Sequence, residues 1–531
     1  MWYKNAIFYE VYVRAFKDSN GDGRGDLLGL AEKLDYLQEL GITALWLMPI
    51  YPSPLKDDGY DIADYYGIHP DYGNLDDFKT LLNEAHKRDI RIILDLVLNH
   101  TSDQHNWFQE ARKDKNSKYR DYYVWSDDNQ KYADARIIFL DTEESNWTWD
   151  ESAKQYFWHR FYSSQPDLNY DNPAVQAEML QVMKFWLDLG VDGFRADAVP
   201  YLFQREGTNC ENLPETHAYL KKIRTYLNEN YADRILLSEA NQYPKDVLPY
   251  FGDGTDEFQM AFHFPLMPRL YMALAKADRA PLEWVMAETP PIPPNTQWCI
   301  FLRNHDELTL EMVTEEERQW MWNRYAPDPR MKLNLGIRRR LAPLVGGDLR
   351  RIALLNSLLF TLPGTPILYY GDEIGMGDDI SLPDRDGVRT PMQWTSENSA
   401  GFSSAEQFYA PLISDENYAP QKVNVVAQKA APNSLFNIIR RMIFLRKKNA
   451  IFGHGGFAWV SAPAAVAAYT RQFEGEKMLI LNNLSEEEQE FTLEEDYRDI
   501  LNEKNIKKGI FTLHPYQYFW LSSSRSKGFS S

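Results

Sequence analysis

The stretch 191–197, which reads Val-Asp-Gly-Phe-Arg-Ala-Asp, places an arginine and a carboxylate two residues apart. On a β-strand, residues two apart point to the same face, so Arg195 and Asp197 are expected side by side. The charge and hydrogen bonds of an arginine favour the ionised form of a neighbouring carboxylate. An ionised, oriented carboxylate at the end of a barrel strand can act as a nucleophile, whereas the alternative is a structural Arg–Asp pair that closes a strand.

Three other apolar runs also end in polar groups. These groups are Asp95, Asn99 and His100 in one run, Glu239 in a second, and His305 and Asp306 in a third. A carboxyl group among apolar walls has a raised pKa, as a general acid requires, and a histidine beside an aspartate can bind two neighbouring hydroxyls. Each motif alone is weak, because an Asn-His pair is often a turn and an acid after a strand often caps a helix.

The elements that must position these residues follow a repeated pattern. Strand-length apolar runs alternate with helical patterns, at residues 7–13, 42–48, 90–98, 193–197, 235–239, 258–262, 298–304 and 366–370. This alternation predicts a (β/α)8 TIM barrel, whose active site is built at the carboxyl ends of the strands. Asp197, Glu239 and Asp306 would then meet at one mouth, and two acids in opposite roles are what glycoside cleavage needs.

The alternation of strands and helices is interrupted, and the interruptions divide the chain into several predicted parts. The predicted parts are a first barrel segment (1–99), an inserted irregular subdomain after strand 3 (100–172), the rest of the barrel (173–450), a C-terminal antiparallel β-sandwich domain (451–522) and a tail (523–531). A helical insertion after strand 7, at about 307–347, carries helical patterns at 314–324 and 332–340.

Composition narrows the function further. The 57 Lys and Arg against 77 Asp and Glu give a net charge of −20, which argues against nucleic acid or an anionic membrane as a partner. The 15 Trp and 32 Tyr suit stacking on sugar faces or a large aromatic core. Two distant cysteines, Cys210 and Cys299, exclude a disulfide framework. The start of the chain has no apolar run of signal-peptide length, and the run 352–370 predicts a buried helix and strand, so we expect a cytoplasmic protein without a membrane span.

The four motifs around Asp95–His100, Gly193–Asp197, Glu239 and Arg303–Asp306 together resemble the signature regions of the α-amylase superfamily of glycoside hydrolases. Residues 165–169 and 389–394 are similar to its oligo-1,6-glucosidase-like branch. Residues 198–217, 311–348 and 378–387 look like its trehalose synthase branch, whose members isomerise maltose to trehalose reversibly by retaining intramolecular glucosyl transfer. The resemblance covers nearly the whole chain.

The resemblance implies a role for each matching residue. Asp197 would be the nucleophile, Glu239 the general acid/base, and Asp306 the group that stabilises the oxocarbenium-like transition state. Arg195 would hold Asp197, and Arg389 would pair with Asp57. The remaining residues implied to bind the substrate are Asp57, Tyr60, Asn99, His100, Gln165, Arg195, His305 and Arg389.

One or two structural Ca²⁺ sites are also expected, and no organic cofactor. Residues 18–26 carry side-chain oxygen ligands at alternate positions, namely Asp18, Asn20, Asp22 and Asp26, and the resemblance implies the carbonyl of Arg24 as a further ligand. This spacing is typical of a calcium loop, although a solvated turn is the alternative. By resemblance, a second and weaker site would use Asn99, Asp167, the carbonyls of Tyr201 and Leu202, and Gln204 or Glu206.

Three functions compete. The first is glucosyl isomerisation of maltose and trehalose with minor hydrolysis to glucose. The second is an α-glucosidase or oligo-1,6-glucosidase, which shares the chemistry but uses water as the acceptor. The third is a catalytically inactive transporter-associated homologue, against which the intact acid triad argues. A homo-oligomer and a separate maltokinase partner are both compatible with the sequence.

Overall fold

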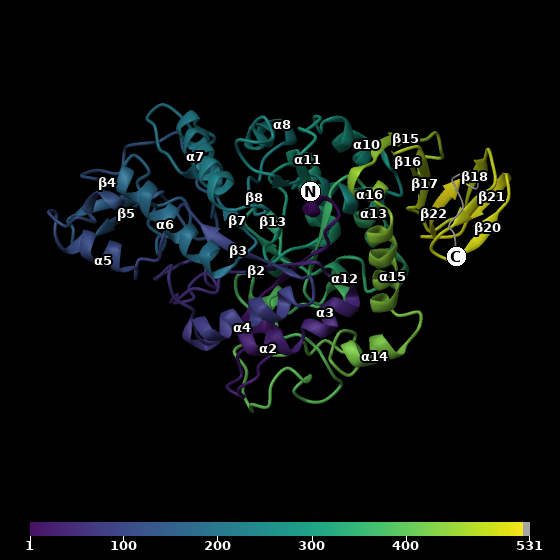
Figure 1. Ribbon diagram of the computed structural model, residues 1–531, viewed down its shortest axis with the longest axis horizontal. Helices are drawn as coiled ribbons and strands as arrows, with labels where there is room; N and C mark the ends of the chain where they lie inside the picture. The colour runs from purple at the N-terminus through teal and green to yellow at the C-terminus, as the bar shows by residue number, and fades with distance from the viewer. Residues whose placement is uncertain (524–531) are drawn as a thin grey trace.

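In the computed structural model, which describes residues 1–523, eight parallel strands close into a barrel at the centre of the molecule (Figure 1). In order around the barrel they are β1 (Phe8–Val11), β14 (Thr365–Tyr369), β10 (Gln297–Phe301), β9 (Met260–Phe262), β8 (Ile235–Ser238), β7 (Gly193–Asp197), β3 (Arg91–Val97) and β2 (Ala44–Leu47). Each lies within or beside a run predicted above, so the predicted barrel is confirmed.

Helices cover the outside of the barrel. The principal ones are α2 (Leu27–Glu32), α3 (Leu34–Leu40), α4 (Leu75–His86), α6 (Pro173–Leu189), α7 (Pro214–Asn230), α8 (Pro244–Val247), α9 (Leu266–Lys276), α10 (Ala280–Ala287), α13 (Leu349–Thr361) and α15 (Leu435–Lys448). Strong local signals set the helix that leads into β7. The side chain of Asn172 accepts the N–H of Ala174, Pro173 occupies the first turn, and Gly190 ends α6 at a φ of 109°.

β7 then enters the barrel at a glycine. A Cβ on Gly193 would lie 2.4 Å from the carbonyl oxygen of Ile235 on β8, so only glycine allows the two strands to approach this closely. Pairing with β3 sets Arg195 opposite Asp95 and Asp197 opposite Val97. This register places the carboxyl end of β7 beside that of β3.

The inserted subdomain after β3 forms one end of the long axis (Figure 1). It contains α5 (Asn106–Lys113) and a small antiparallel sheet in the order β4 (Trp125–Ser126), β6 (Gln155–Trp158), β5 (Trp147–Asp150). An antiparallel bridge between His100 and Asp167 joins the two ends of this subdomain at the barrel.

The insertion after β10 differs from its prediction. It holds α11 (Glu315–Tyr325), as the pattern at 314–324 indicated, and the short α12 (Leu341–Leu344). The prediction of a helix at 332–340 is wrong. Residues there form β12 (Lys332–Leu333) and β13 (Gly336–Ile337), and β13 also pairs with β11 (Leu308–Thr309). Asn334 takes a φ of 48°, so a tight hairpin turn replaces the helix that the charged residues suggested.

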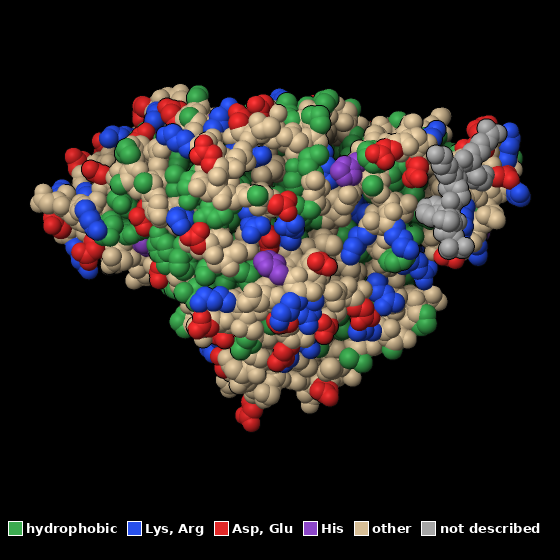
Figure 2. All heavy atoms as spheres, viewed as in Figure 1, with side chains coloured by type: hydrophobic (Ala, Val, Ile, Leu, Met, Phe, Trp, Pro, Cys, Tyr) green, Lys and Arg blue, Asp and Glu red, His purple; other side chains and the backbone are tan. Residues whose placement is uncertain are grey.

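On the surface, positive and negative side chains are interspersed over the face shown in Figure 2, although acidic residues exceed basic ones by 20. Such mixing leaves no large field of one sign on this face. No helix within residues 1–523 combines the length and the apolar character needed to cross a bilayer.

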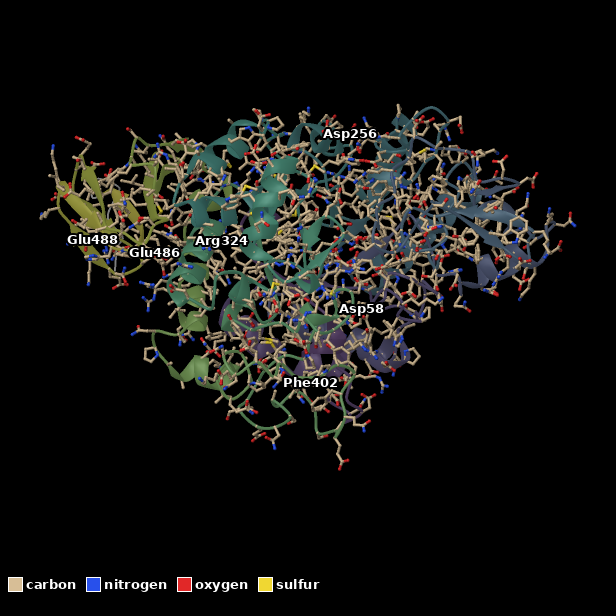
Figure 3. All side chains as sticks on the ribbon, turned by 180° about the vertical axis from the view of Figure 1, so that it is seen from behind. Asp58, Asp256, Arg324, Phe402, Glu486 and Glu488 are labelled. Carbon is tan, nitrogen blue, oxygen red and sulfur yellow. The ribbon has the colours of Figure 1, made fainter. Side chains whose placement is uncertain are left out.

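The C-terminal domain lies at the other end of the long axis from the inserted subdomain (Figure 1). Its larger sheet has the order β15 (Gly456–Trp459), β16 (Val466–Phe473), β17 (Glu476–Asn483), β22 (Tyr518–Ser523), β19 (Tyr497–Asp499), β20 (Lys504–Ile506), and its smaller sheet pairs β18 (Gln489–Leu493) with β21 (Gly509–Leu513). Leu479 and Leu481 of the larger sheet share a core with Phe491 and Leu513 of the smaller one, as in a sandwich. Glu486 and Glu488 mark this domain in Figure 3. Residues 524–531 of the predicted tail lie outside the described residues.

Helix α13 of the barrel is bound directly to the C-terminal domain. Ser357 donates to Asn482 at 2.8 Å and accepts the indole N–H of Trp520 at 3.0 Å. The hydroxyls of Thr361 and Tyr469 lie 2.6 Å apart, and Arg471 donates to the carbonyl of Thr361. These contacts are buried, so the two parts share one interface of hydrogen bonds and apolar packing.

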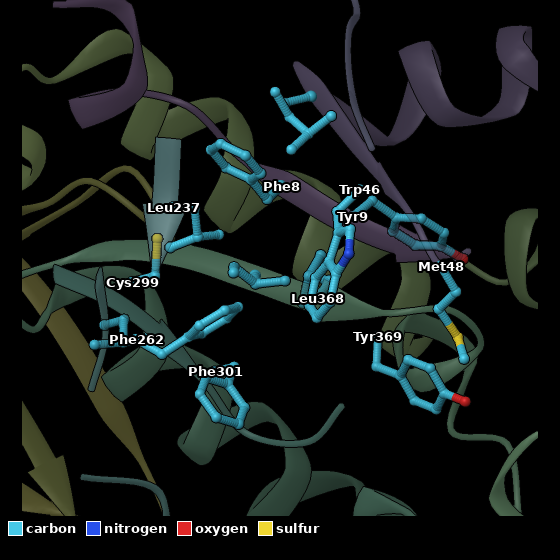
Figure 4. Packing of buried hydrophobic residues seen from close by; sticks show 14 of the residues in the cluster. Phe8, Tyr9, Trp46, Met48, Leu237, Phe262, Cys299, Phe301, Leu368 and Tyr369 are labelled. Carbon is cyan, nitrogen blue, oxygen red and sulfur yellow. The ribbon is translucent and has the colours of Figure 1, made fainter. Parts of the chain in front are cut away.

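The barrel interior is filled rather than hollow. Figure 4 shows the side chains of Phe8, Trp46, Phe262, Phe301 and Leu368 packed at its centre, and each is at most 3% exposed. A solid core of this kind holds the strand ends in fixed positions and confines chemistry to the loops at the carboxyl face.

Candidate active site

Arg195 lies at the centre of a group of carboxylates. Its guanidinium donates to Asp95 at 2.7 Å and to Asp197 at 2.5 Å, and it also forms an ion pair with Glu239. The three acids come from three adjacent strand ends, β3, β7 and β8, and the Arg195 side chain is only 1% exposed. A planar guanidinium with five donors is suited to hold several carboxylates in fixed orientations.

The backbone around the two strand ends sets the distance between Asp197 and Glu239. Directly after Asp197, Ala198 takes a left-handed conformation with a φ of 52° and donates its N–H to the Glu239 carboxylate at 3.2 Å. The N–H of Glu239 in turn bonds to the carbonyl of Ala196 at 3.0 Å. A non-glycine residue at positive φ is a strained position of the kind that concentrates at functional sites.

The charge state of Asp197 differs from the simple expectation. Burial raises the pKa of Asp197 well above its ordinary value; Arg195 opposes this rise, and the charges of Glu239 and Asp95 add to it. Arg195, shared among three acids, therefore does not offset the effect of burial on the pKa of Asp197. The free pocket disfavours the ionised form of Asp197 relative to a carboxylate in water.

Asp306 has the opposite character. Burial alone would raise its pKa, but His305, Arg385 and Arg389 outweigh burial and hold the pKa of Asp306 well below its ordinary value. Its Oδ2 lies 3.1 Å from Nε2 of His305, and its Oδ1 accepts from Arg385 at 2.7 Å and from Arg389 at 3.2 Å. The pocket thus lowers the pKa of Asp306 and raises the pKa of Asp197.

The pairing predicted for Asp57 is wrong. Arg385, not Arg389, binds Asp57, with 2.6 Å between Nη2 and Oδ1, while Arg389 reaches Asp58 at 2.5 Å. Arg385 precedes Arg389 by four residues within a stretch already linked to the family, so either could have been chosen from sequence. The second oxygen of Asp57 accepts from Gln165 at 2.9 Å.

Aromatic and imidazole rings complete the floor of the site. Tyr60 stacks on His305, with ring centroids 5.2 Å apart and 13° between planes, and donates to Asp95 at 3.0 Å. Burial lowers the pKa of His100 to about 3, so this ring is neutral, and its Nε2 has no hydrogen-bond partner within the described part of the chain. That nitrogen is available to a ligand in the pocket.

These groups line a single cavity. The lining residues are Asp57, Tyr60, His100, Ile138, Phe139, Phe161, Asp197, Ala198, Pro200, Tyr201, Glu239, Asn241, Phe264, His305, Asp306, Glu307, Thr309, Glu311, Asn334 and Arg385. Four residues predicted to bind the substrate are not among them. Arg195, Arg389 and Gln165 lie behind the lining and hold Asp197, Asp306 and Asp57, and Asn99 bonds to Asp167 at 2.9 Å.

The two insertions meet over this cavity. Arg136 of the inserted subdomain forms ion pairs with Glu311 of the other insertion and with Glu211, both at 2.8 Å. Asp141 of the inserted subdomain accepts the N–H of Asn334 at 2.7 Å. Sequence reasoning located both insertions but missed the residues that join them, because ion pairs between distant loops leave no local pattern.

Comparison with known proteins decides the family. The family model of the α-amylase catalytic domain matches residues 10–326 and 338–455. The family model of the C-terminal domain of the α-amylase SusG matches residues 466–517. The chain belongs to the α-amylase family. The unmatched residues 327–337 fall within the insertion after β10.

Individual relatives within the α-amylase family agree. The chain is 58% identical over 493 residues to the trehalose synthase/amylase TreS of Mycobacterium tuberculosis (strain CDC 1551 / Oshkosh), covering 91% of this chain and 82% of the relative. It is 32% identical to an oligo-1,6-glucosidase of Bacillus cereus, covering 97% and 98%. The solved trehalulose synthase MutB from Pseudomonas mesoacidophila MX-45 has a TM-score of 0.81 and 29% identity, covering 98% and 99%.

The calcium loop expected in this α-amylase family member folds back on itself. Asp18 accepts the N–H groups of Asn20, Gly21 and Gly23, and Asp26 accepts those of Ser19 and Gly29. Among residues 1–523, no group of three or more His, Cys, Asp or Glu side chains is gathered in a way that could hold a metal ion. The turn fits a cation only in part, since Asp22 and Asn20 also bond to the backbone of the loop.

The second expected site fits less well. Oδ1 of Asn99 and Oδ2 of Asp167 are buried without a hydrogen-bond partner, as ligands awaiting a cation would be. However, the amide of Gln204 donates to the carbonyl of Tyr201 at 3.4 Å, so those two groups already bind each other. Burial raises the pKa of Asp167 to about 8, so this carboxyl group would have to release a proton for a cation to bind.

Proposed function

We propose that this protein interconverts maltose and trehalose by moving a glucosyl unit within one pocket, with minor hydrolysis to glucose. The observation that carries this proposal is the cover formed by the two insertions over the acid triad, joined through Arg136 and Glu311. The 58% identity to a trehalose synthase supports the same substrate pair.

The acids have complementary tasks. Asp197 attacks C1 of the bound glucosyl unit while Glu239 gives a proton to O4 of the departing glucose, so the C1–O4 bond breaks as the C1–Oδ bond forms. This step requires Asp197 to be ionised and Glu239 to carry the proton. Asp306, held ionised by His305 and Arg385, stabilises the positive charge that develops on the ring.

The second half of the reaction reverses the proton movement. The released glucose turns so that its anomeric oxygen faces C1, Glu239 accepts the proton of that hydroxyl, and the new C1–O1 bond displaces Asp197. Two displacements preserve the α configuration. Because water competes throughout the turn, retention of glucose depends on a closed pocket.

Hydrolysis is the second candidate function. The 32% identity to an oligo-1,6-glucosidase favours it, and the two reactions differ only in the acceptor. Incubation of the enzyme with unlabelled maltose and an excess of ¹³C-glucose distinguishes isomerisation within a closed pocket, hydrolysis, and transfer to glucose from solution by an open transglucosidase. We expect trehalose to form with little label; glucose as the main product would favour the hydrolase, and heavy early labelling would contradict a retained glucose.

Replacement of Arg136 tests the role of the cover. Arg136→Ala removes the ion pairs to Glu311 and Glu211 without touching the three acids. We expect the ratio of glucose to trehalose among the products to rise about two- to tenfold, since water then enters during the turn. Arg205→Ala, which removes surface ion pairs to Asp171 and Glu215, is the matched control and is expected to leave the ratio unchanged.

A further inference from the structure

Glu10, on β1, is a buried acid outside the groups assigned so far. Glu10 is 0% exposed. Its Oε1 contacts Nδ1 of His305 and accepts the backbone N–H of His305 at 3.3 Å. Its Oε2 has no hydrogen-bond partner among residues 1–523. An ionisable side chain inside an apolar barrel is costly, so a glutamate here requires a reason.

We propose that Glu10 is a positioning residue for the reaction: its carboxylate keeps His305 protonated and turns the far side of the ring toward Asp306. The inference rests on the proposed function, because it concerns the pocket in which the glucosyl unit binds. Glu10 itself does not line that pocket, and acts only through His305.

The geometry forms a line of three groups from the barrel core to the pocket. Glu10 contacts Nδ1 of His305, and Nε2 of the same ring lies 3.1 Å from Oδ2 of Asp306. An acceptor at Nδ1 fixes which way the imidazole faces, and when the ring is protonated Nε2 also carries a hydrogen that it can donate toward Asp306. Tyr60 stacked on the ring and Trp46 at its edge, 5.6 Å between centroids, prevent it from turning.

The surrounding charges favour the cationic ring. Burial would lower the pKa of His305, but Asp306 and Glu10 outweigh it and raise the pKa to about 9. The other charged and titratable groups that face this pair are Arg195, Tyr369 and Asp372 toward Glu10, and Asp95, Tyr60 and Arg389 toward His305. Two of these groups are cations: Arg195 is bound to three acids of its own, and Arg389 donates to the carbonyl of His305 but is paired with Asp58 and Asp306.

A protonated His305 serves the chemistry in two ways. Its charge contributes to the low pKa of Asp306, which must be ionised to stabilise a cationic transition state. Its Nε2–H, 3.1 Å from Oδ2 of Asp306, also holds that carboxylate in a fixed orientation at the pocket. Loss of the Glu10 charge would weaken both contributions while leaving the three acids in place.

Glu10→Gln tests the charge at nearly constant shape. In ¹⁵N-histidine-labelled protein without substrate, the ring signals of His305, assigned with His305→Asn, should titrate about 1 to 3 pH units lower in Glu10→Gln than in the unchanged protein. An unchanged titration of His305 would overturn the proposal. This measurement needs no substrate, so its result does not depend on which reaction the enzyme performs.

A matched control separates charge from packing. Glu373 is also fully buried at a strand end, but it binds Tyr9 and Tyr36 rather than a histidine. Glu373→Gln is expected to leave the titration of His305 unchanged. If Glu10→Gln does not fold, Glu10→Asp decides instead: withdrawing the carboxylate by one methylene should still lower the titration by half a unit or more, and no shift contradicts the proposal.

Kinetics provide the second readout. The ratio of kcat/KM for maltose in Glu10→Gln to that of the unchanged enzyme should fall about tenfold between pH 6 and pH 9, because the variant loses the imidazolium within this range. A purely structural role would lower the rate equally at all pH values, and that result would count against a role of the charge.

Discussion

The guanidinium of Arg195 is shared by three carboxylates, and this sharing helps to explain why the pKa of Asp197 is raised although an arginine binds it. Asp306, by contrast, has two arginines and a histidine. The pKa values of Asp197 and Asp306 are therefore shifted in opposite directions, because the two acids contact different numbers of cations. Environments that push titratable groups apart in this way are how one pocket assigns acid and base roles.

Replacing the nucleophile and the acid should have different signatures. Asp197→Asn removes the attacking oxygen and is expected to lower kcat by about a thousandfold or more, with folding unchanged. Glu239→Gln should cost about 10²- to 10⁴-fold with maltose but much less in the first step with an aryl α-glucoside, whose leaving group needs no proton. Measurement of kcat and of the burst of released phenol checks both. Near-normal turnover by Asp197→Asn would exclude the covalent route.

Arg385 is expected to be important for activity because its guanidinium is a fork whose two terminal nitrogens bind different acids. It reaches Asp57 with one terminal nitrogen and Asp306 with the other. Arg385→Lys keeps the charge but cannot bind both acids, so kcat/KM should fall about 10- to 100-fold. Arg339→Lys is the control, since Arg339 pairs with Asp378 and contacts neither acid. Equal losses in the two variants would show that the effect comes from the loop and not from the fork.

At the level of elements, the pairing of β7 with β8 depends on the close approach of the two strands at Gly193. Gly193→Ala would push a methyl group against the carbonyl of Ile235, and we expect a loss of about 1–3 kcal/mol in the free energy of unfolding. Denaturant titration followed by tryptophan fluorescence measures it. Gly207→Ala is a control at a glycine with open space around it, although its φ of 72° adds some strain of its own. A smaller loss at Gly193 than at Gly207 would contradict the packing argument.

Much of this element order was predictable from sequence, and the exceptions have physical causes. The barrel runs and α6 carry their own signals, such as apolar runs bounded by Asn172 and Gly190. The hairpin at 332–337 was missed because its partner strand β11 lies more than twenty residues earlier, and local charge suggested a helix. The exchange of Arg385 for Arg389 and the contact between Glu10 and His305 depend on side-chain directions in segments far apart in the sequence, which spacing does not fix.

At the level of the whole molecule, the loop 18–26 links the first barrel unit to a late segment of the chain. The N–H of Asp18 bonds to the carbonyl of Phe402, which is labelled at the lower edge of Figure 3, and Tyr409 donates to the carbonyl of Gly23. A cation held in this loop would strengthen that link by mass action on the folded state.

Removal of calcium tests this link. If the loop binds Ca²⁺, chelation with EGTA should lower the melting temperature by a few degrees, and Asp22→Ala should abolish the response to added Ca²⁺ while changing kcat little. Asp114→Ala is the control, since Asp114, like Asp22, is exposed and accepts the N–H two residues on at 2.8 Å. A melting temperature that ignores both chelator and Ca²⁺ would argue for a plain turn.

The bonds between α13 and the C-terminal domain also impose an order on biosynthesis. Ser357 finds Trp520 only 163 residues later in the chain. At a typical synthesis rate, roughly ten to thirty seconds pass between the two, and the barrel helix leaves the ribosome tunnel with a polar, unfinished side. Nascent chains that stop before β17 should therefore be retained by chaperones or aggregate. The synthesis of β17 and β22 would thus be the step that lets this helix bury its polar side chains.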